Sequence, residues 1–229
     1  MDSDAIYRKL QSWGSFAIRR LGRWEVRGVE AIPKSGPAIL AANHLCYLDP
    51  PLVAALAPRP VRFVAKTELF AIPVLRRFLR WIGTIPVERS RPDVRAVRES
   101  LRVLERGELL GIFPEGTRYR HGGLGAFHEG VGWFAIKARA PVIPIAIYGY
   151  VPWKKGSTWM RPGRLKILCG EPLFFPAERY PSGKKPYRAE ATREVYLAIQ
   201  ALLDAAKERI PGAARDDPLQ SSVPGTHGH

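Results

Sequence analysis

Residues 38–56 read AILAANHLCYLDPPLVAAL, an apolar run, a short polar turn and a second apolar run. The first run is rich in Ala, Ile and Leu and carries no charge, which predicts a buried strand. Pro50 follows Asp49, and proline is well tolerated at the first position of a helix. A buried strand that leads through a turn into a helix is the repeating unit of an α/β fold.

Six further short apolar runs alternate with helical patterns along the chain. We therefore predict an α/β fold in which a central, mostly seven-stranded sheet is flanked by helices in one domain, residues 23–210. The seven expected strands are residues 24–29, 38–43, 61–66, 84–87, 109–113, 142–148 and 164–168. The clearest expected helices are residues 93–106, about 129–139 and about 189–210.

Two of these helices have apolar stripes that predict which face is buried. In the helix over 93–106, which Asp93 starts and Gly107 stops, the stripe consists of Val94, Val97, Leu101 and Leu104. In the helix over 189–210 it consists of Val195, Ile199, Leu202, Ala206 and Ile210.

The two ends of the chain differ from this pattern. Residues 5–21 form a cationic amphipathic pattern, so residues 1–22 are either a membrane-surface anchor or an ordinary helix packed on the domain. Residues 211–229 are polar and small, and we expect a disordered tail.

No apolar stretch reaches the length of a membrane span, and two cysteines do not form a disulfide framework. We expect a cytoplasmic protein.

The chain is strongly basic, with 36 Lys and Arg against 21 Asp and Glu and a formal charge of +15. Such a charge indicates polyanionic partners: nucleic acid, an anionic membrane surface or an acidic carrier protein. No zinc spacing, aromatic sheet motif or helix-turn-helix pattern supports nucleic acid. Arg76, Arg77 and Arg80 interleave with apolar residues on one expected helix, a pattern that suits a phospholipid surface.

His44 and Asp49 are candidates for proton transfer because they flank the turn after the strand over 38–43. Sites in open α/β sheets form outside the carboxyl ends of strands. A histidine oriented by a carboxylate is a suitable general base. Taken alone, Asp49 could be a plain helix cap and His44 a core histidine. Since Cys46 is more easily directed away from the site than toward it, the nucleophile would be a hydroxyl of the substrate.

A second candidate segment is LLGIFPEGTRYR, residues 109–120, a buried strand that runs into a tight turn. Its backbone amides and Arg118 could hold an anion, although a plain surface turn is the alternative. Lys66 and Arg89 each follow another expected strand. His121 and His128 lack further ligands at a usual spacing, so we expect no metal site.

Taken together, NHLCYLD, KTEL with GTIPVER, FPEGTR and APVIPIAI resemble the glycerolipid acyltransferases, in particular the 1-acyl-glycerol-3-phosphate acyltransferases, over about residues 24–205. The resemblance implies that His44 is the general base and that Asp49 supports it. It implies an acceptor-phosphate site made of Glu115, Gly116, Thr117, Arg118, Lys66 and Arg89. It implies that Val142, Ile143 and Pro144 support the acyl site.

The implied reaction moves an acyl group from acyl-CoA or acyl carrier protein, as co-substrate and without a cofactor, to lysophosphatidate. It would take place at the cytoplasmic face of the cell membrane, with the chain bound peripherally. Cys46, Glu88 and His128 stand where the family usually has Ser, Asp and Lys. The last two leave open another lyso-lipid acceptor. A non-catalytic lipid-binding or nucleic-acid-binding protein is the alternative from another class.

Overall fold

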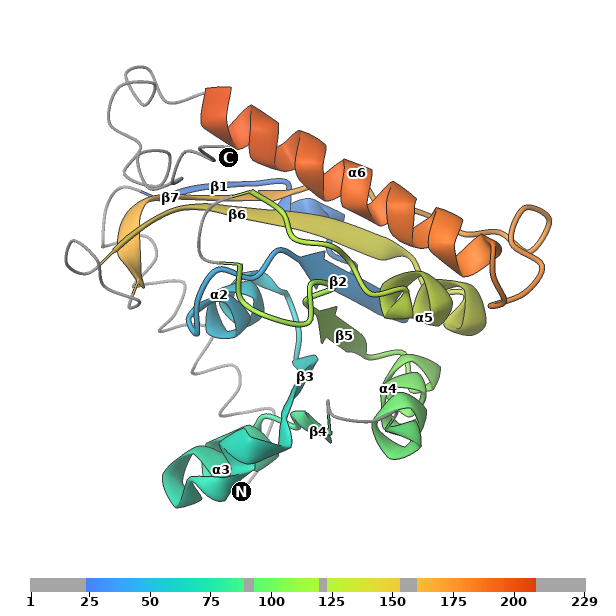
Figure 1. The fold of residues 1–229 in the computed structure, drawn as a ribbon, viewed down its shortest axis with the longest axis horizontal. Helices are drawn as coiled ribbons and strands as arrows, with labels where there is room; N and C mark the ends of the chain where they lie inside the picture. Colours follow the sequence, from blue (N-terminus) through green and yellow to red (C-terminus); the bar gives the residue numbers. More distant parts are fainter. Residues whose placement is uncertain (1–23, 89–92, 120–122, 153–159, 209–229) are drawn as a thin grey trace, which may run out of the picture.

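The computed structural model describes residues 24–88, 93–119, 123–152 and 160–208 of the 229-residue chain. Its centre is one seven-stranded sheet (Figure 1), which confirms the predicted fold class and all seven expected strands. The strands are β1 (Glu25–Arg27), β2 (Ala38–Ala42), β3 (Val61–Lys66), β4 (Ile85–Val87), β5 (Leu109–Ile112), β6 (Val142–Pro152) and β7 (Met160–Cys169).

The helices that flank this sheet include the three predicted most clearly. They are α2 (Asp49–Leu56), α3 (Pro73–Trp81), α4 (Val94–Glu105), α5 (Gly130–Ala138) and α6 (Tyr187–Glu208), with short 3₁₀ turns η1 (Val29–Ala31) and η2 (Thr67–Ala71). The helix expected over 5–21 and the tail expected over 211–229 lie outside the described residues. Among the helices described, none combines the length and apolar character needed to cross a bilayer.

The strand order is β1-β7-β6-β2-β5-β3-β4, and the last five of these strands run parallel to one another. β7 runs antiparallel to β6, and β1 follows the direction of β7. Parallel neighbours end at the same edge of a sheet. The residues after β2, β3, β4 and β5 therefore share one edge, although they are far apart in the sequence.

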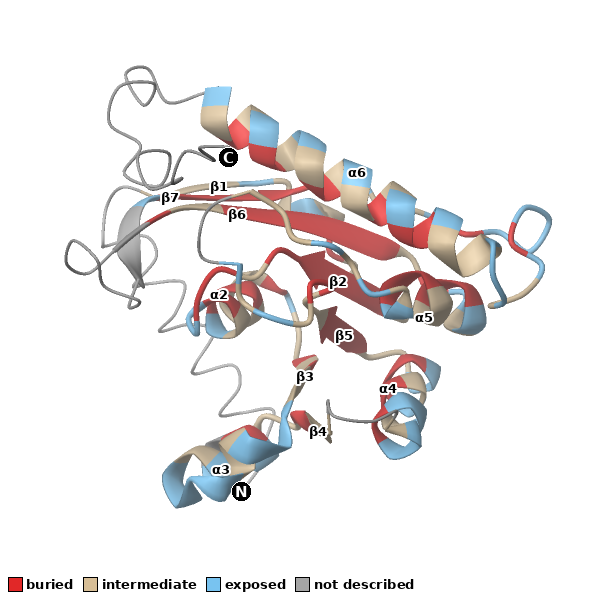
Figure 2. Ribbon diagram, viewed as in Figure 1, coloured by how far each residue is buried: buried red, intermediate tan, exposed pale blue. Residues whose placement is uncertain are grey.

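Apolar side chains cover both faces of the sheet, because successive residues of a strand point to opposite sides. Leu40 faces a core that includes α2 and the residues around η1, while Ile39 faces a core shared with α4, α5 and α6. Figure 2 shows the central strands coloured as buried, and in β2 every residue is buried, so both of its faces are covered. Near-continuous apolar runs such as AILAA are typical of strands buried on both faces.

The buried face of α4 differs from the predicted stripe. Asp93 caps the helix as expected, since its Oδ1 accepts from the Ala96 amide at 2.9 Å. Val94 and Val97 of the stripe are 58% and 37% exposed. The face turned to the core consists of Ala96, Ser100, Val103 and Leu104. Ser100 fits there because its hydroxyl donates to the carbonyl of Ala96 at 2.8 Å. In α6, Val195, Ile199 and Ala206 of the predicted stripe are buried, whereas Ile210 lies outside the described residues.

The connections after β2 and β5 lead to opposite faces of the sheet. β2 leads into α2 on one face of the sheet, whereas the chain after β5 leads to α5 on the other. Neighbouring parallel strands whose connections diverge in this way create a crevice at their carboxyl ends, the usual place of a site in an open α/β sheet. Both candidate segments of the sequence, NHLCYLD and FPEGTR, lie at this crevice.

Candidate active site

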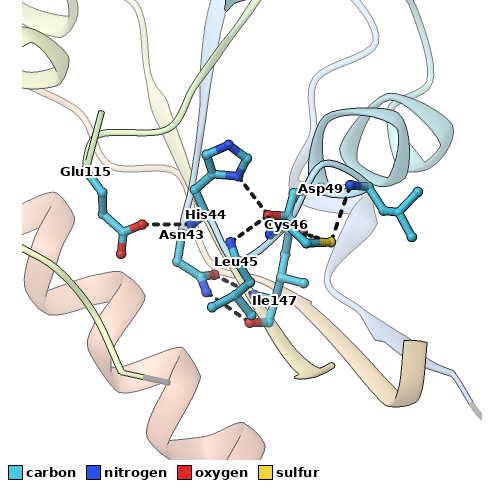
Figure 3. Close-up of polar contacts among 8 residues, drawn as sticks. Asn43, His44, Leu45, Cys46, Asp49, Glu115 and Ile147 are labelled. Carbon is cyan, nitrogen blue, oxygen red and sulfur yellow. Dashed lines mark hydrogen bonds and ion pairs between the residues drawn. The ribbon is translucent and has the colours of Figure 1, made fainter. Parts of the chain in front are cut away.

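The predicted pair of His44 and Asp49 is formed. Nδ1 of His44 lies 2.8 Å from Oδ2 of Asp49, with side-chain exposures of 14% and 0%. Because an ionised carboxylate only accepts hydrogen bonds, this contact places a proton on Nδ1 and leaves Nε2 to take a proton. The imidazole can therefore act as a general base toward a group bound at the crevice (Figure 3).

Asp49 is held by the turn that it closes. Its Oδ2 also accepts from the amides of Leu45 at 2.6 Å and Cys46 at 2.8 Å. The alternative interpretation, a plain cap of α2, is wrong: Leu48 occupies the cap position without a side-chain bond, and Asp49 is the first helical residue. The carboxylate points back over the histidine turn, so its position is fixed independently of the imidazole.

Cys46 lies behind this carboxylate and away from the open side of the site. Its sulfur is 3.7 Å from Oδ1 of Asp49, and the residue is 7% exposed. Burial, with the charge of Asp49 second, raises the pKa of the thiol to about 11. Burial likewise raises the pKa of the neighbouring Tyr150 hydroxyl, with the charge of Asp49 adding to it. The thiol therefore stays protonated near neutral pH, which is inconsistent with a cysteine nucleophile.

Asn43 attaches the turn to β6, a role that the sequence alone did not indicate. Its Nδ2 donates to the carbonyl of Ile147 at 3.0 Å, and its Oδ1 accepts from the Ile147 amide at 2.7 Å. Asn43 is fully buried. The side-chain amide thus continues the hydrogen bonding of the sheet one step beyond β2 and fixes the backbone immediately before His44.

Glu115 braces the same turn from the other side. Its Oε2 accepts from the His44 amide at 2.9 Å (Figure 3). Its Oε1 accepts from the Gly125 amide at 3.0 Å. The residue is 4% exposed, and burial raises the pKa of its carboxyl, partly offset by these two bonds. Both oxygens are engaged and the group is negative when ionised. This geometry gives Glu115 a bracing role in place of the predicted contact with phosphate.

Phe113 of the FPEGTR loop and Tyr119, which follows the loop, also contact His44. The ring of Phe113 stacks on the imidazole with centroids 4.3 Å apart, and the Tyr119 amide donates to the carbonyl of His44 at 2.7 Å. The histidine is thus held through its ring, its amide and its carbonyl. Such fixation of a proton-transfer group in advance reduces what must be reorganised during a reaction.

The residues predicted to bind phosphate differ in their surroundings. The Gly116 amide donates to the carbonyl of Phe113 at 3.0 Å, so this glycine shapes the turn. Thr117 is exposed, and the guanidinium carbon of Arg118 lies 3.7 Å from the ring centroid of Tyr47. Lys66 is exposed at the end of β3, the strand next to β5. Arg89 lies outside the described residues.

Val142, Ile143 and Pro144 lie in the core behind the histidine turn. Val142 and Pro144 pair with Ile39 and Ala41 of β2, which places the segment about 10–16 Å behind His44 along the strand direction. Val142 and Ile143 are fully buried, one in the core of each face. Their side chains pack the sheet under the site, and their support of an acyl site stays a prediction.

Comparison with known proteins identifies the family of the chain. A model of the Acyltransferase family matches residues 23–148, more than half of the chain. A 1-acyl-sn-glycerol-3-phosphate acyltransferase of Pseudomonas aeruginosa is 30% identical over 177 residues, which are 74% of this chain and 68% of that protein. A chloroplastic 1-acyl-sn-glycerol-3-phosphate acyltransferase of Brassica napus is 31% identical over 140 residues, 60% of this chain. The chain spans 40% of the length of that plant relative.

A solved structure shares the fold. The 1-acyl-sn-glycerophosphate (LPA) acyltransferase PlsC of Thermotoga maritima superposes with a TM-score of 0.73 at 28% identity, covering 90% of this chain and 81% of that one. The region that the family model matches, residues 23–148, contains the histidine turn, the FPEGTR loop and the strands β2 and β5 that bring them together. On the match to its sequence model and on these relatives, the chain belongs to the Acyltransferase family.

Proposed function

We propose that this chain is an O-acyltransferase that moves an acyl group from a thioester to the free hydroxyl of 1-acyl-glycerol-3-phosphate, forming phosphatidate. The observation that carries the proposal is the contact of 2.8 Å between His44 Nδ1 and Asp49 Oδ2 at the mouth of the crevice. The names of the relatives supply the substrate, because several are 1-acyl-sn-glycerol-3-phosphate acyltransferases.

The reaction follows from the orientation of the imidazole. Nε2 of His44 takes the proton of the acceptor hydroxyl while its oxygen attacks the thioester carbonyl. Asp49 stabilises the resulting imidazolium through Nδ1. When the tetrahedral intermediate collapses, the C–S bond breaks, and the imidazolium returns its proton to the departing thiolate. The products are an ester and a free thiol, and no residue of the chain is acylated.

We assign the acceptor phosphate to Arg118, Thr117, Lys66 and Arg89. Arg118 can grip a phosphate with two parallel hydrogen bonds, and Thr117 and Lys66 add a hydroxyl and an ammonium from exposed positions. We include Arg89 because it follows β4 closely in the sequence. Glu115 acts instead as the brace of the histidine turn.

The thioester donor is acyl-CoA or acyl carrier protein, both of which carry negative charge that the +15 chain attracts. Since the acceptor is a membrane lipid, we place the reaction at a membrane surface, on the cytoplasmic face of the cell membrane. The chain would bind there peripherally, as a partner of anionic lipid and not of nucleic acid.

The proposal is tested by following free-thiol release by the purified chain in detergent. Acyl-CoA and acyl carrier protein are offered in turn, with lysophosphatidate, with a lysophospholipid or lyso-aminolipid, or with an analogue of lysophosphatidate that lacks the free hydroxyl. We expect release that requires lysophosphatidate and its hydroxyl, with phosphatidate identified by mass spectrometry. Turnover of another lyso-lipid in preference would assign that acceptor instead. Release independent of any acceptor, or none with every pair, would contradict acyl transfer.

A further inference from the structure

Helix α3 stands apart from the two layers that cover the sheet (Figures 1 and 2). Its inner side is anchored by Leu79, which is 9% exposed. Most of its other described side chains face solvent. Together with Ile72, which directly precedes the helix, those on this outer side form what we call the α3 surface: Ile72, Pro73, Val74, Arg76, Arg77 and Arg80.

The charge of the α3 surface is of one sign. Residues 73–81 read PVLRRFLRW, with three arginines and no acidic residue. Within the described residues, no carboxylate forms an ion pair with Arg76, Arg77 or Arg80, and together with Pro73 they line an open recess. Three unneutralised guanidinium groups on one helix form a local site for anions.

Apolar side chains lie at the amino-terminal end of the same surface. Ile72 is 54% exposed and Val74 is 84% exposed, the highest value among the large apolar residues described. Covering an exposed apolar side chain lowers the free energy in proportion to the apolar area removed from water. Nucleic acid would satisfy the arginines but not these aliphatic side chains, whereas a lipid bilayer satisfies both.

Helix α4 shows what sets α3 apart. It also exposes Val94 and Val97 and carries three exposed arginines, Arg95, Arg98 and Arg102. However, its sequence includes Glu99 and Glu105, and Glu99 forms an ion pair with Arg102 at 3.2 Å. Helix α3 therefore has a net charge of +3 from its own residues, whereas α4 has +1, from three arginines and two glutamates.

We propose that the α3 surface binds an anionic lipid bilayer, with its arginines on lipid phosphates and with Ile72 and Val74 in the boundary between headgroups and acyl chains. Helix α3 follows β3 through η2, and β3 ends at Lys66 on the edge of the sheet that carries His44. Binding through α3 therefore turns this edge toward the bilayer. This inference rests on the peripheral binding to anionic lipid proposed above, names the surface that makes it, and holds whatever the acceptor is.

The test is flotation of the full chain with phosphatidylcholine vesicles that do or do not contain phosphatidylglycerol. Three variants are compared with wild type: Arg76→Gln/Arg77→Gln/Arg80→Gln, Ile72→Ser/Val74→Ser, and the control Arg95→Gln/Arg98→Gln/Arg102→Gln, which removes the same charge from α4. A cation close to anionic lipid contributes about 1 kcal/mol, so the first variant should lose roughly a hundredfold in partition coefficient. The serine variant should also bind more weakly, and the α4 control should bind within a few-fold of wild type.

Two results overturn the proposal. Equal losses from the α3 and α4 arginines would show attraction by total charge, and unchanged binding of both α3 variants would assign the contact to another part of the chain. Thiol release with detergent-dispersed substrates, measured on the same variants, should stay at the wild-type rate. Its loss would place α3 in the substrate site instead. Flotation measures membrane binding alone. It therefore tests the α3 proposal even if the wild-type chain shows no acyltransferase activity.

Discussion

The amide of His44 donates to Oε2 of Glu115 at 2.9 Å, which joins two loops that are 71 positions apart in the sequence. The histidine lies between this carboxylate, which holds its backbone, and Asp49, which holds its ring. Removing either contact should change the rate of the reaction more than the binding of a substrate. The FPEGTR loop thus contains two different functions, a brace in Glu115 and a proposed phosphate contact in Arg118.

The first prediction compares Glu115→Gln with Arg118→Ala. A glutamine can accept from only one of the two amides and presents an N–H group to the other, so the His44 turn loses a bond at a cost of about 1–3 kcal/mol. We expect kcat to fall by about tenfold or more, with the acceptor KM within about threefold of wild type. For Arg118→Ala we expect mainly a higher acceptor KM.

Steady-state kinetics at varied lysophosphatidate separates the two effects. A Glu115→Gln variant with an unchanged kcat and a raised acceptor KM would return this residue to the phosphate site. An Arg118→Ala variant that loses kcat at an unchanged KM would move the arginine to the reacting centre.

The second prediction concerns the pH dependence of stability. Burial raises the pKa of Glu115 in the folded chain above its usual 4.5. At a pH between the two pKa values, Glu115 is protonated in the folded chain and ionised in the unfolded chain. The protonated carboxyl therefore contributes stability that is complete below pH 4.5 and is lost as pH rises through the folded pKa. Wild type should therefore lose stability relative to Glu115→Gln as pH rises from 4.5 toward neutrality.

Urea unfolding of both proteins across this pH range gives the difference in free energy of unfolding. The missing hydrogen bond of the variant shifts that difference by a constant, so its slope with pH isolates the carboxyl group. A flat difference, or one that favours wild type as pH rises, would show that burial does not disfavour the ionised Glu115.

The third prediction concerns Cys46→Ala. Since the thiol is buried with a pKa of about 11, it takes no part in the chemistry, and the variant should keep kcat within about threefold of wild type. Iodoacetamide should leave the rate of folded wild type unchanged. Loss of turnover in the alanine variant, together with an acylated cysteine in the mass spectrum of wild type, would establish a covalent intermediate and refute direct attack by the acceptor hydroxyl.

The fourth prediction isolates a steric contact in the FPEGTR loop. Gly116 has φ of +65°, and a Cβ there would lie 2.7 Å from the His128 ring. Gly36 has φ of +75° with nothing within 4 Å of such a Cβ, so Gly36→Ala is the matched control for backbone strain. Each alanine should cost about 1–2 kcal/mol in strain. Gly116→Ala should cost more and also lower kcat, whereas Gly36→Ala should leave kcat unchanged.

Thermal unfolding and turnover of the two alanine variants check this. Equal losses of stability with wild-type turnover in both would mean that His128 moves aside freely and that the shape of this turn is not coupled to His44.

The sequence predicts much of the fold because the buried parallel strands consist of short runs of apolar residues. Runs such as AILAA and LLGIF mark their strands directly. Helix faces are harder to predict: α4 buries the small residues Ala96 and Ser100 in place of Val94 and Val97, since a small face lets a helix approach the sheet closely. Strand order and direction depend on contacts distant in sequence and are not encoded in any local pattern.

The site divides in the same way. His44 and Asp49 are five residues apart, so the sequence suffices to pair them. The brace formed by Glu115 depends on β2 and β5 being neighbours, which only the folded sheet shows. The residue type alone could have indicated this role for Glu115, because a carboxylate is an unsuitable ligand for phosphate and a good acceptor for backbone amides. The position of Val142, Ile143 and Pro144 depends on the register of β6 with β2, which places these residues in the core.

The central claim is that His44 takes the proton of the acceptor hydroxyl. The most direct test is lysophosphatidate-dependent thiol release by His44→Ala beside wild type, with circular dichroism and thermal unfolding to show that both are folded. The account predicts that the alanine variant loses about a hundredfold to ten-thousandfold in kcat, as expected when a general base is removed, and remains folded. A folded His44→Ala variant that keeps a rate within tenfold of wild type would contradict it.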